Sequence, residues 1–312
     1  MIARFRYYSS IIKKRAYRRW FNWRCRDIYR SPPLSCSPDG PLIVSQLYSP
    51  DVVMYLLAAK SFCRFIKPSG FVLVDDGLTK LDRIQLLHHL GNVEFIPSAD
   101  VQVECCPRGG CWERLLTLSS FNGKQYVVQL DSDTLTLSDP VEVRECIASQ
   151  QTFTLGTPSG RSIVSAAEAT AFANLDPDDH VQSWLERSLD SLPDASGVKY
   201  VRGCAGFTGF APGTLSRVRI EQFVAQLGAL IGTKRFSQWG SEQVVSNLMA
   251  ANAPTPLVLP VDTYPFWEPN LPVKNLRLVH FFGTFRFEQG MYLDKTRGII
   301  TELLRKPQAT MA

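Results

Sequence analysis

The chain has 312 residues, of which 45% are hydrophobic and 20% are charged. This length and composition predict a globular protein with a substantial core, folded as one large domain or two small ones. The sequence excludes a membrane-spanning helix, because no apolar run approaches the roughly 20 residues that a bilayer requires. Charged residues also interrupt each apolar stretch near the N-terminus, so we predict no signal peptide and a soluble, cytoplasmic protein.

The formal net charge of +5 is concentrated at the N-terminus. Residues 1–30 contain ten basic residues and one acidic residue, a local charge of +9, so the rest of the chain carries −4. A basic segment of this kind is typical of an attached arm rather than of a nucleic-acid-binding domain. We therefore expect no nucleic-acid partner.

The basic segment has the spacing of an amphipathic helix. Between Ile12 and Trp23 the apolar side chains fall on about half of the helical circumference, with most basic residues opposite. One interpretation is an arm that binds an anionic membrane surface, which would place the protein peripherally at the inner membrane face. The other is a helix packed on its own domain. The Pro- and Gly-containing stretch 31–40 reads as a linker, so we divide the chain into an arm and linker, 1–40, and a catalytic domain, 41–312.

From Pro41 onward, apolar runs of strand length alternate with helical patterns. The predicted strands are 42–44, 71–74, 93–96, 126–130, 152–155, 205–210, 257–259 and 276–282. The predicted helices are 52–65, 81–90, 112–121, 164–173, 181–189, 215–230, 243–251 and 292–304. Alternating strands and helices predict an α/β fold, with a Rossmann-like, mostly parallel sheet flanked by helices. Strands that are apolar throughout fit a sheet covered on both faces.

Ligands of open α/β sheets bind at the carboxyl ends of the strands. Polar side chains follow three of the predicted strands: Ser45 and Gln46, Asp75 and Asp76, and the trio Asp131, Ser132 and Asp133. The two acids of the trio would repel each other at a sheet edge unless a cation lay between them. Mn²⁺ or Mg²⁺ would satisfy such oxygen ligands and could also bind a diphosphate. The alternative is that the acids only cap turns.

The string from Tyr126 to Pro140, YVVQLDSDTLTLSDP, resembles the DxD segment of GT-A-fold glycosyltransferases. Three later stretches are similar, in order, to patterns of family-8-like members. They are Gly203–Phe210 with its small residues, Gly240–Gln243 with Asn247, and Leu278–Gly283 with His280 ahead of Phe281 and Gly283. The resemblance spans about 41–286 and implies a GT-A fold, with a nucleotide half near 41–140 and an acceptor half near 141–312.

The resemblance also implies roles for individual residues. It implies that Asp131, Asp133 and His280 bind Mn²⁺ or Mg²⁺, and that Ser45, Gln46, Asp75, Asp76, Ser132 and Arg286 contact a nucleotide-diphospho-sugar donor, for which UDP is suggested. It implies catalytic roles for Glu242 and Gln243, and an acceptor side at Gly206, Thr208 and Trp239, for a glycan or lipid-linked hydroxyl. Retention of anomeric configuration is favoured. Arg286 stands near where the family pattern has a lysine, and Glu242 where it has an aspartate.

Two other functions are compatible with the same residues. Phosphohydrolases of the haloacid dehalogenase type also place Asp-x-Asp after a strand and use the first acid as a nucleophile. Those enzymes have Thr or Val two positions after the second acid, where this chain has Leu135. Their motif also lies near the N-terminus, whereas here about ninety residues of α/β pattern precede it. The second alternative is a non-catalytic adaptor at a membrane surface, with a degenerate GT-A domain.

The eight cysteines predict free thiols in a reducing compartment rather than a disulfide framework. Cys105, Cys106 and Cys111 lie close in sequence, but no further Cys or His pair stands nearby to complete a zinc site.

Overall fold

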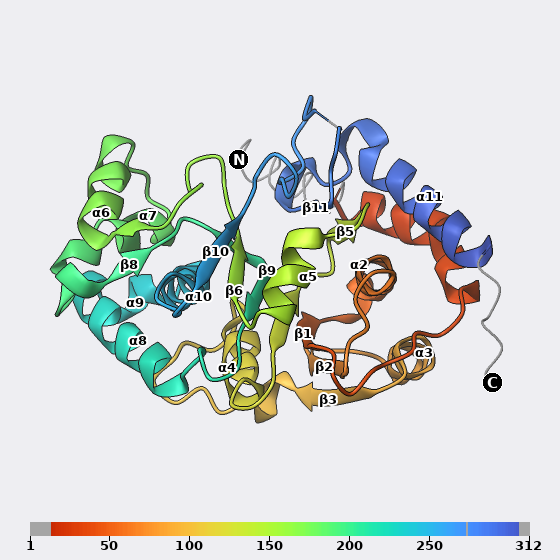
Figure 1. The fold of residues 1–312 in the computed structure, drawn as a ribbon, viewed down its shortest axis with the longest axis horizontal. Helices are drawn as coiled ribbons and strands as arrows, with labels where there is room; N and C mark the ends of the chain where they lie inside the picture. The colour runs from red at the N-terminus through yellow and green to blue at the C-terminus, as the bar shows by residue number, and fades with distance from the viewer. Residues whose placement is uncertain (1–13, 273, 306–312) are drawn as a thin grey trace, which may run out of the picture.

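The computed structural model describes residues 14–272 and 274–305. A seven-stranded sheet with the order β10-β6-β9-β4-β1-β2-β3 forms its centre (Figure 1). Its strands are β1 (Leu42–Leu47), β2 (Gly70–Asp75), β3 (Val93–Pro97), β4 (Val127–Leu130), β6 (Thr152–Leu155), β9 (Cys204–Phe210) and β10 (Pro256–Leu259). Neighbouring strands are parallel except at β9, which runs antiparallel to both β4 and β6. The predicted mostly parallel sheet is confirmed.

Two small sheets complete the strand inventory of the described residues. β5 (Thr134–Thr136) pairs antiparallel with β11 (Leu278–His280), and β7 (Val164–Ser165) pairs with β8 (Lys199–Tyr200). The first pair matters for the site, because β5 directly follows the Asp131–Asp133 turn. It therefore brings a late segment of the chain to the end of β4.

Helices cover both faces of the sheet (Figure 1). They are α2 (Val52–Cys63), α3 (Lys80–Leu90), α4 (Trp112–Phe121), α5 (Val141–Ala148), α6 (Ala166–Leu175), α7 (Val181–Glu186), α8 (Arg217–Ile231), α9 (Thr233–Phe236), α10 (Ser241–Ala251) and α11 (Met291–Arg305). Short 3₁₀ helices are η1 (Arg26–Arg30), η2 (Ser49–Asp51), η3 (Ser98–Asp100), η4 (Leu189–Ser191), η5 (Ala195–Gly197), η6 (Gly283–Phe285) and η7 (Glu288–Gly290).

The inner strands are largely apolar because successive side chains enter different cores. In β1, Ile43 packs with α2 and α11 on one face, whereas Val44 packs with α4, α8 and α10 on the other. Side chains alternate along a strand, so a strand buried on both faces cannot show polar alternation. Neither residue has any exposed surface.

Most predicted elements are present, with shifted ends. The predicted helix 164–173 is instead the short strand β7 followed by α6, because Ser165 caps the helix by accepting a hydrogen bond from the backbone N–H of Glu168. The predicted strand 276–282 contracts to the three residues of β11. Helices α5 and α9 are additions to the predicted set.

The described part of the basic arm is a helix over 14–24 that continues into η1. Phe21, Cys25 and Ile28 are fully buried, and the Phe21 ring stacks on Tyr292 of α11 with centroids 4.5 Å apart. The arm therefore packs on the domain through one side, as one of the two interpretations requires. The predicted start of the arm lies outside the described residues. No helix in the described ranges is long and apolar enough to cross a bilayer.

Candidate functional site

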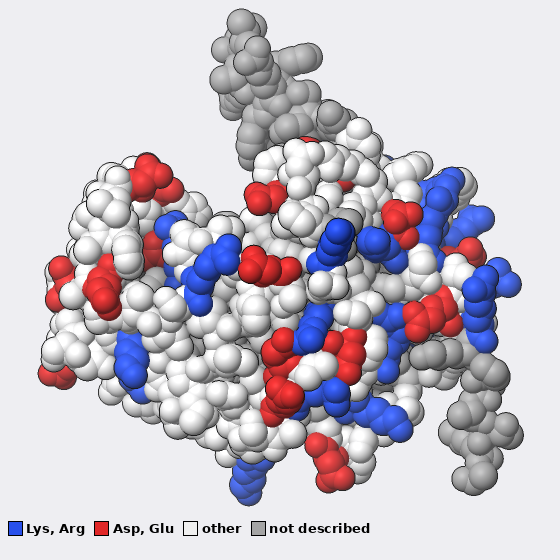
Figure 2. Space-filling model, turned by 45° about the horizontal axis from the view of Figure 1, so that its top comes forward, with Lys and Arg blue, Asp and Glu red and all other residues white. Residues whose placement is uncertain are grey.

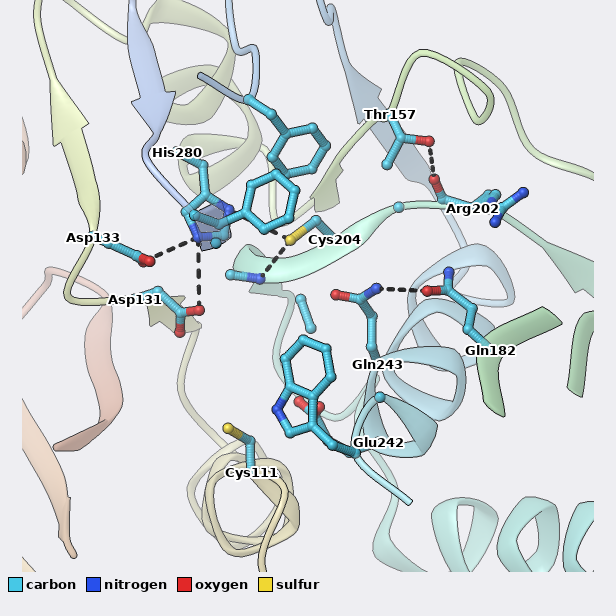
Figure 3. Close-up of a pocket in the computed structure, with 18 of the residues that line it drawn as sticks. Cys111, Asp131, Asp133, Thr157, Gln182, Arg202, Cys204, Glu242, Gln243 and His280 are labelled. Atoms are coloured by element: carbon cyan, nitrogen blue, oxygen red, sulfur yellow. Dashed lines mark hydrogen bonds and ion pairs between the residues drawn. The ribbon is translucent and has the colours of Figure 1, made fainter. Parts of the chain in front are cut away.

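A cavity of about 560 Å³ lies at the carboxyl end of β4. Asp131 and Asp133 line one side of it, and the start of α10 lines the other (Figure 3). Figure 2 shows its mouth as a hollow between the part of the molecule with α6 and α7 and the part with β11. The predicted residues that line it are Asp131, Asp133, Gly206, Trp239, Glu242, Gln243, His280 and Arg286.

Three ligand atoms converge at the edge of this cavity. The His280 Nε2 atom lies 3.0 Å from Asp133 Oδ1 and 3.9 Å from Asp131 Oδ2. The other oxygen of each carboxylate pairs with an arginine, Arg114 for Asp131 and Arg286 for Asp133. The arginines thus hold the outer oxygens and turn the inner oxygens toward the histidine. Among the described residues, these three form the group whose ligand atoms lie within 4.8 Å of one another.

His280 reaches the two acids through strand pairing and a glycine. In the β5–β11 ladder His280 is opposite Thr134, and the Phe281 N–H donates to Asp133 O at 2.8 Å. On the other side, β9 passes so close that a Cβ atom at Gly206 would lie 2.3 Å from His280 Cε1. Only a residue without a side chain allows the imidazole to lie there.

Burial and charge act against each other in this cluster. Burial raises the pKa of Asp131, although Arg114 opposes this effect. Burial also opposes ionisation of Asp133, but Arg286 and His280 together hold its pKa below the usual range. Burial alone would lower the pKa of His280, yet Asp133 keeps it well above the usual value. Two carboxylate oxygens and an imidazole nitrogen form a donor set that can hold a divalent cation.

The cluster continues to α10 through one arginine. Arg114, in the first turn of α4, lies 3.1 Å from Glu242 Oε1 while its other terminal nitrogen pairs with Asp131. Burial raises the pKa of Glu242 to about 7, with Arg114 acting in the opposite direction. Next to Glu242, the Gln243 side chain donates from Nε2 to Gln182 Oε1 of α7 at 3.2 Å.

Of the residues predicted to bind the donor, some line a cavity, whereas the side chains of others form hydrogen bonds within the fold. Gln46 and Asp76 line a second cavity of about 580 Å³, together with Glu113 of α4. Asp75 instead caps its turn by accepting from the Gly77 and Leu78 N–H groups at 3.0 and 2.7 Å. Ser45 is also internal, because its Oγ donates to Leu130 O at 2.7 Å. Ser132 contributes its carbonyl to a 3.5 Å contact with the Tyr292 hydroxyl.

The predicted acceptor residues divide in the same way. Trp239 lines the main cavity with 71% of its surface exposed, and its ring makes an edge contact with His180. Thr208 is buried and shares a 3.2 Å hydrogen bond with Thr154, so it lies away from the cavity. The rings of Phe266 and Phe282 also line the cavity, in an edge-to-face pair.

Three residues that line this cavity lie outside the predicted set, namely Arg114, Gln182 and Cys204. Arg114 was a polar position of the predicted helix 112–121, and it is 5% exposed. A charge on an otherwise buried helix is a usable signal, since such a charge needs a partner. Gln182 and Cys204, whose sulfur lies 3.5 Å from His280 Nδ1, carry no comparable signal.

No protein-family model and no curated protein sequence matches the chain. Solved structures do match. The bifunctional glycosyltransferase WbbM is 15% identical with a TM-score of 0.51, over 87% of this chain and 52% of its own. The galactosyltransferase LgtC, in complex with donor and acceptor sugar analogues, is 12% identical with a TM-score of 0.53, over 86% of this chain and 98% of its own. An active-site mutant of LgtC gives 13% and 0.51.

These similarities show that the chain has a GT-A-type fold, as the DxD-like string predicts. The chain spans about half of the length of WbbM but nearly all of LgtC. The haloacid dehalogenase alternative requires another fold and is set aside. Resemblance to family 8 in particular stays a prediction.

Proposed function

We propose that the protein is a metal-dependent glycosyltransferase that moves a sugar from a nucleotide-diphospho-sugar, with UDP as the favoured nucleotide, to a hydroxyl acceptor. The observation that carries the proposal is the convergence of Asp131 Oδ2, Asp133 Oδ1 and His280 Nε2 at the rim of a cavity in a GT-A fold. Mn²⁺ or Mg²⁺ held there would bind the donor diphosphate and stabilise the charge that develops on the leaving group.

The two cavities suggest how a donor would lie. The first turn of α4 separates them, because Glu113 lines the second cavity and Arg114 lines the first. In this arrangement the nucleoside occupies the second cavity near Gln46 and Asp76, and the diphosphate extends to the carboxylates. Buried oxygens without a hydrogen-bond partner among the described residues, Gln46 Oε1 and Glu113 Oε2, are available there. Arginine is well suited to phosphate, so Arg286 is the proposed diphosphate contact.

The acceptor side is aromatic. Trp239, Phe266 and Phe282 line the remainder of the cavity and offer faces on which a sugar ring can stack. A glycan, free or lipid-linked, is therefore the proposed acceptor. An inverting reaction needs a side-chain base, and Glu242 Oε1 is already paired with Arg114. The neutral amide of Gln243 lies beside it, which favours retention.

The test uses the full chain with a panel of nucleotide sugars, with and without Mn²⁺. We expect a Mn²⁺-dependent rise in Tm with the matching donor, slow Mn²⁺-dependent donor hydrolysis, and loss of both in Asp133→Asn. Asp139→Asn is the matched control, because Asp139 is a partly exposed acid paired with Arg144 outside the cavity. If the wild-type protein neither binds nor hydrolyses any donor, the transferase proposal is refuted and the non-catalytic adaptor is favoured. Full hydrolysis by Asp133→Asn would remove the metal assignment.

We also propose that the arm binds an anionic membrane surface. Trp20 and Trp23 are 48% and 55% exposed on the helix over 14–24, and the Arg24 and Arg26 guanidinium groups lie 5.8 and 5.6 Å from the Trp23 ring centre. Exposed tryptophans among basic residues suit the headgroup region of a bilayer. In Figure 2, Lys and Arg side chains gather toward the α11 end of the molecule, interspersed with acids.

The membrane proposal is tested by vesicle sedimentation. Trp20→Ala with Trp23→Ala should abolish binding to vesicles with phosphatidylserine, and salt should weaken wild-type binding. Phe172→Ala is the control, because Phe172 is 63% exposed on α6, at the other end of the molecule. The membrane proposal would be refuted if wild-type protein did not bind anionic vesicles, or if the double variant bound them as well as wild type. Neither outcome would affect the transferase proposal.

A further inference from the structure

A chain of hydrogen bonds leads from the interior of the protein to Gln243. Gln243 Nε2 donates to Gln182 Oε1 at 3.2 Å, and Gln182 Nε2 donates to Glu186 Oε1 at 3.1 Å. Tyr200 donates its hydroxyl hydrogen to the same Glu186 oxygen at 2.8 Å. Gln182 and Glu186 lie one turn apart on α7, whereas Gln243 opens α10.

The carboxylate at the inner end fixes the direction of every bond in this chain. An ionised Glu186 can only accept, so Gln182 must present its NH₂ group to it. Gln182 then has its oxygen on the other side and can only accept there, so Gln243 must present its own NH₂ group to Gln182. The amide oxygen of Gln243 is thereby left pointing to the cavity, as Figure 3 shows.

Burial supports the rigidity of this arrangement. The Glu186 residue is 2% exposed and Tyr200 is 1% exposed, so water does not compete for the carboxylate. Arg202 Nε lies 3.5 Å from Glu186 Oε2, which favours the ionised form against the effect of burial. The oxygen and nitrogen ends of a glutamine amide have nearly the same shape, and here the Glu186 carboxylate selects one of the two orientations.

We propose that Gln182 and Glu186 are positioning residues that aim the amide oxygen of Gln243 at the sugar carbon of the bound donor. The inference rests on the proposed glycosyltransferase function. Positive charge develops on that carbon as the bond to the diphosphate breaks, and a fixed carbonyl dipole stabilises it. The opposite orientation would place the NH₂ group there and destabilise the same charge.

The first test measures turnover in variants of the relay. Glu186→Gln allows both amides to reverse, and Gln182→Met removes the acceptor for Gln243 while preserving length. We expect each to lower kcat for Mn²⁺-dependent donor hydrolysis at least about tenfold, with the donor KM within about twofold of wild type. Gln243→Ala should lower kcat similarly, and adding Gln182→Met to it should have no further effect.

A second variant separates polarity from packing. In the exchange Gln182→Glu with Glu186→Gln, the new carboxylate still accepts from Gln243 Nε2, and the new amide at position 186 donates to it. The orientation of Gln243 is preserved, so we expect kcat to return to within about threefold of wild type. Ser183→Ala is the matched control, since it removes a hydrogen bond of the same helix, from the Asp178 N–H to Ser183 Oγ at 3.2 Å, that lies outside the relay. It should lower Tm without lowering kcat.

The outcomes distinguish the two proposals. Wild-type protein with no donor hydrolysis overturns the proposed function and this inference with it. Active wild-type protein in which Gln182→Met turns over normally while Gln243→Ala is impaired overturns the positioning role alone. So does failure of the exchange variant to recover turnover when its Tm matches that of wild type.

Discussion

Replacing Gly206 with alanine tests whether His280 is held in place by the absence of a side chain. The added Cβ would lie 2.3 Å from His280 Cε1, 2.9 Å from Nδ1 and 3.0 Å from Nε2. Carbon atoms pack at about 3.5–4.0 Å, so the imidazole must retreat by about 1 Å. The 3.0 Å contact between His280 Nε2 and Asp133 Oδ1 cannot survive such a shift.

Overpacking of this size costs about 1–3 kcal/mol, which lowers the Tm of a protein of this size by several degrees. The diagnostic effect is on metal. Because one of the three proposed ligands moves, we expect Mn²⁺ affinity, measured by isothermal titration calorimetry, to fall at least about tenfold. Donor hydrolysis should fall with it at low Mn²⁺ and recover in part at high Mn²⁺.

Gly209→Ala on the same strand supplies the control. A Cβ there would lie 2.2 Å from the Phe153 ring, so the stability cost should be comparable, but the clash is with a core side chain away from the metal ligands. We expect Mn²⁺ affinity within about twofold of wild type. Gly206→Ala protein that binds Mn²⁺ as tightly as Gly209→Ala protein would refute the reasoning.

Three further predictions concern the rest of the molecule. His89 is fully buried, neither ring nitrogen has a hydrogen-bond partner in the described part of the chain, and burial with nearby Lys60 lowers its pKa to about 4. Because the pKa of His89 is lower in the folded protein than in the unfolded chain, the unfolded chain binds more protons below pH 6.5, and stability falls as the pH drops toward 4. His89→Leu should remove about 2 kcal/mol of this loss at pH 5, measured by urea unfolding. An unchanged pH dependence of stability in the variant would contradict the prediction. Phe21→Ala should cost about 3–5 kcal/mol, because the ring is fully buried against Tyr292, and a loss below about 1 kcal/mol would mean that the arm does not dock. Cys105 is the exposed thiol among the eight free cysteines, so one equivalent of a thiol reagent should react rapidly in native protein and none in Cys105→Ser.

The parts of the fold that the sequence predicts well are those set by local pattern. A largely apolar run such as 127–130 is typical of a strand covered on both faces, and acids that follow such a strand emerge at the sheet edge. The Asp131–Asp133 pair could therefore be placed before the structure was known. The resemblance of the His280 segment then supplied a third candidate ligand, and the β5–β11 pairing brings it to the two acids.

The residues that escaped prediction are joined by contacts distant in sequence. Arg114 is 17 residues from Asp131 and 128 from Glu242, and Gln182 is 61 residues from Gln243. No local period or motif reports which of several polar residues on a helix will face such a partner. The reverse error has the same origin: Ser45, Asp75 and Thr208 stand at plausible strand positions, but their side chains satisfy hydrogen bonds within the fold. Strand ends show where a site is, and tertiary packing decides which side chains reach it.

The arm illustrates the consequence for experimental design. From composition alone, deletion of residues 1–30 would separate membrane binding from catalysis, since the segment has the charge of an independent arm. In the structure Arg18 pairs with Asp51 at 3.2 Å, and burial raises the pKa of that acid to about 6 despite the arginine. The charge of Arg286, the partner of Asp133, also acts on Asp51 and favours its ionised form. A deletion would uncover the core around Tyr292 and leave the Asp51 carboxylate without its arginine partner, so it would impair the proposed activity for reasons unrelated to membranes. The exposed tryptophans can be changed without touching that core, so a loss of vesicle binding in their absence is interpretable.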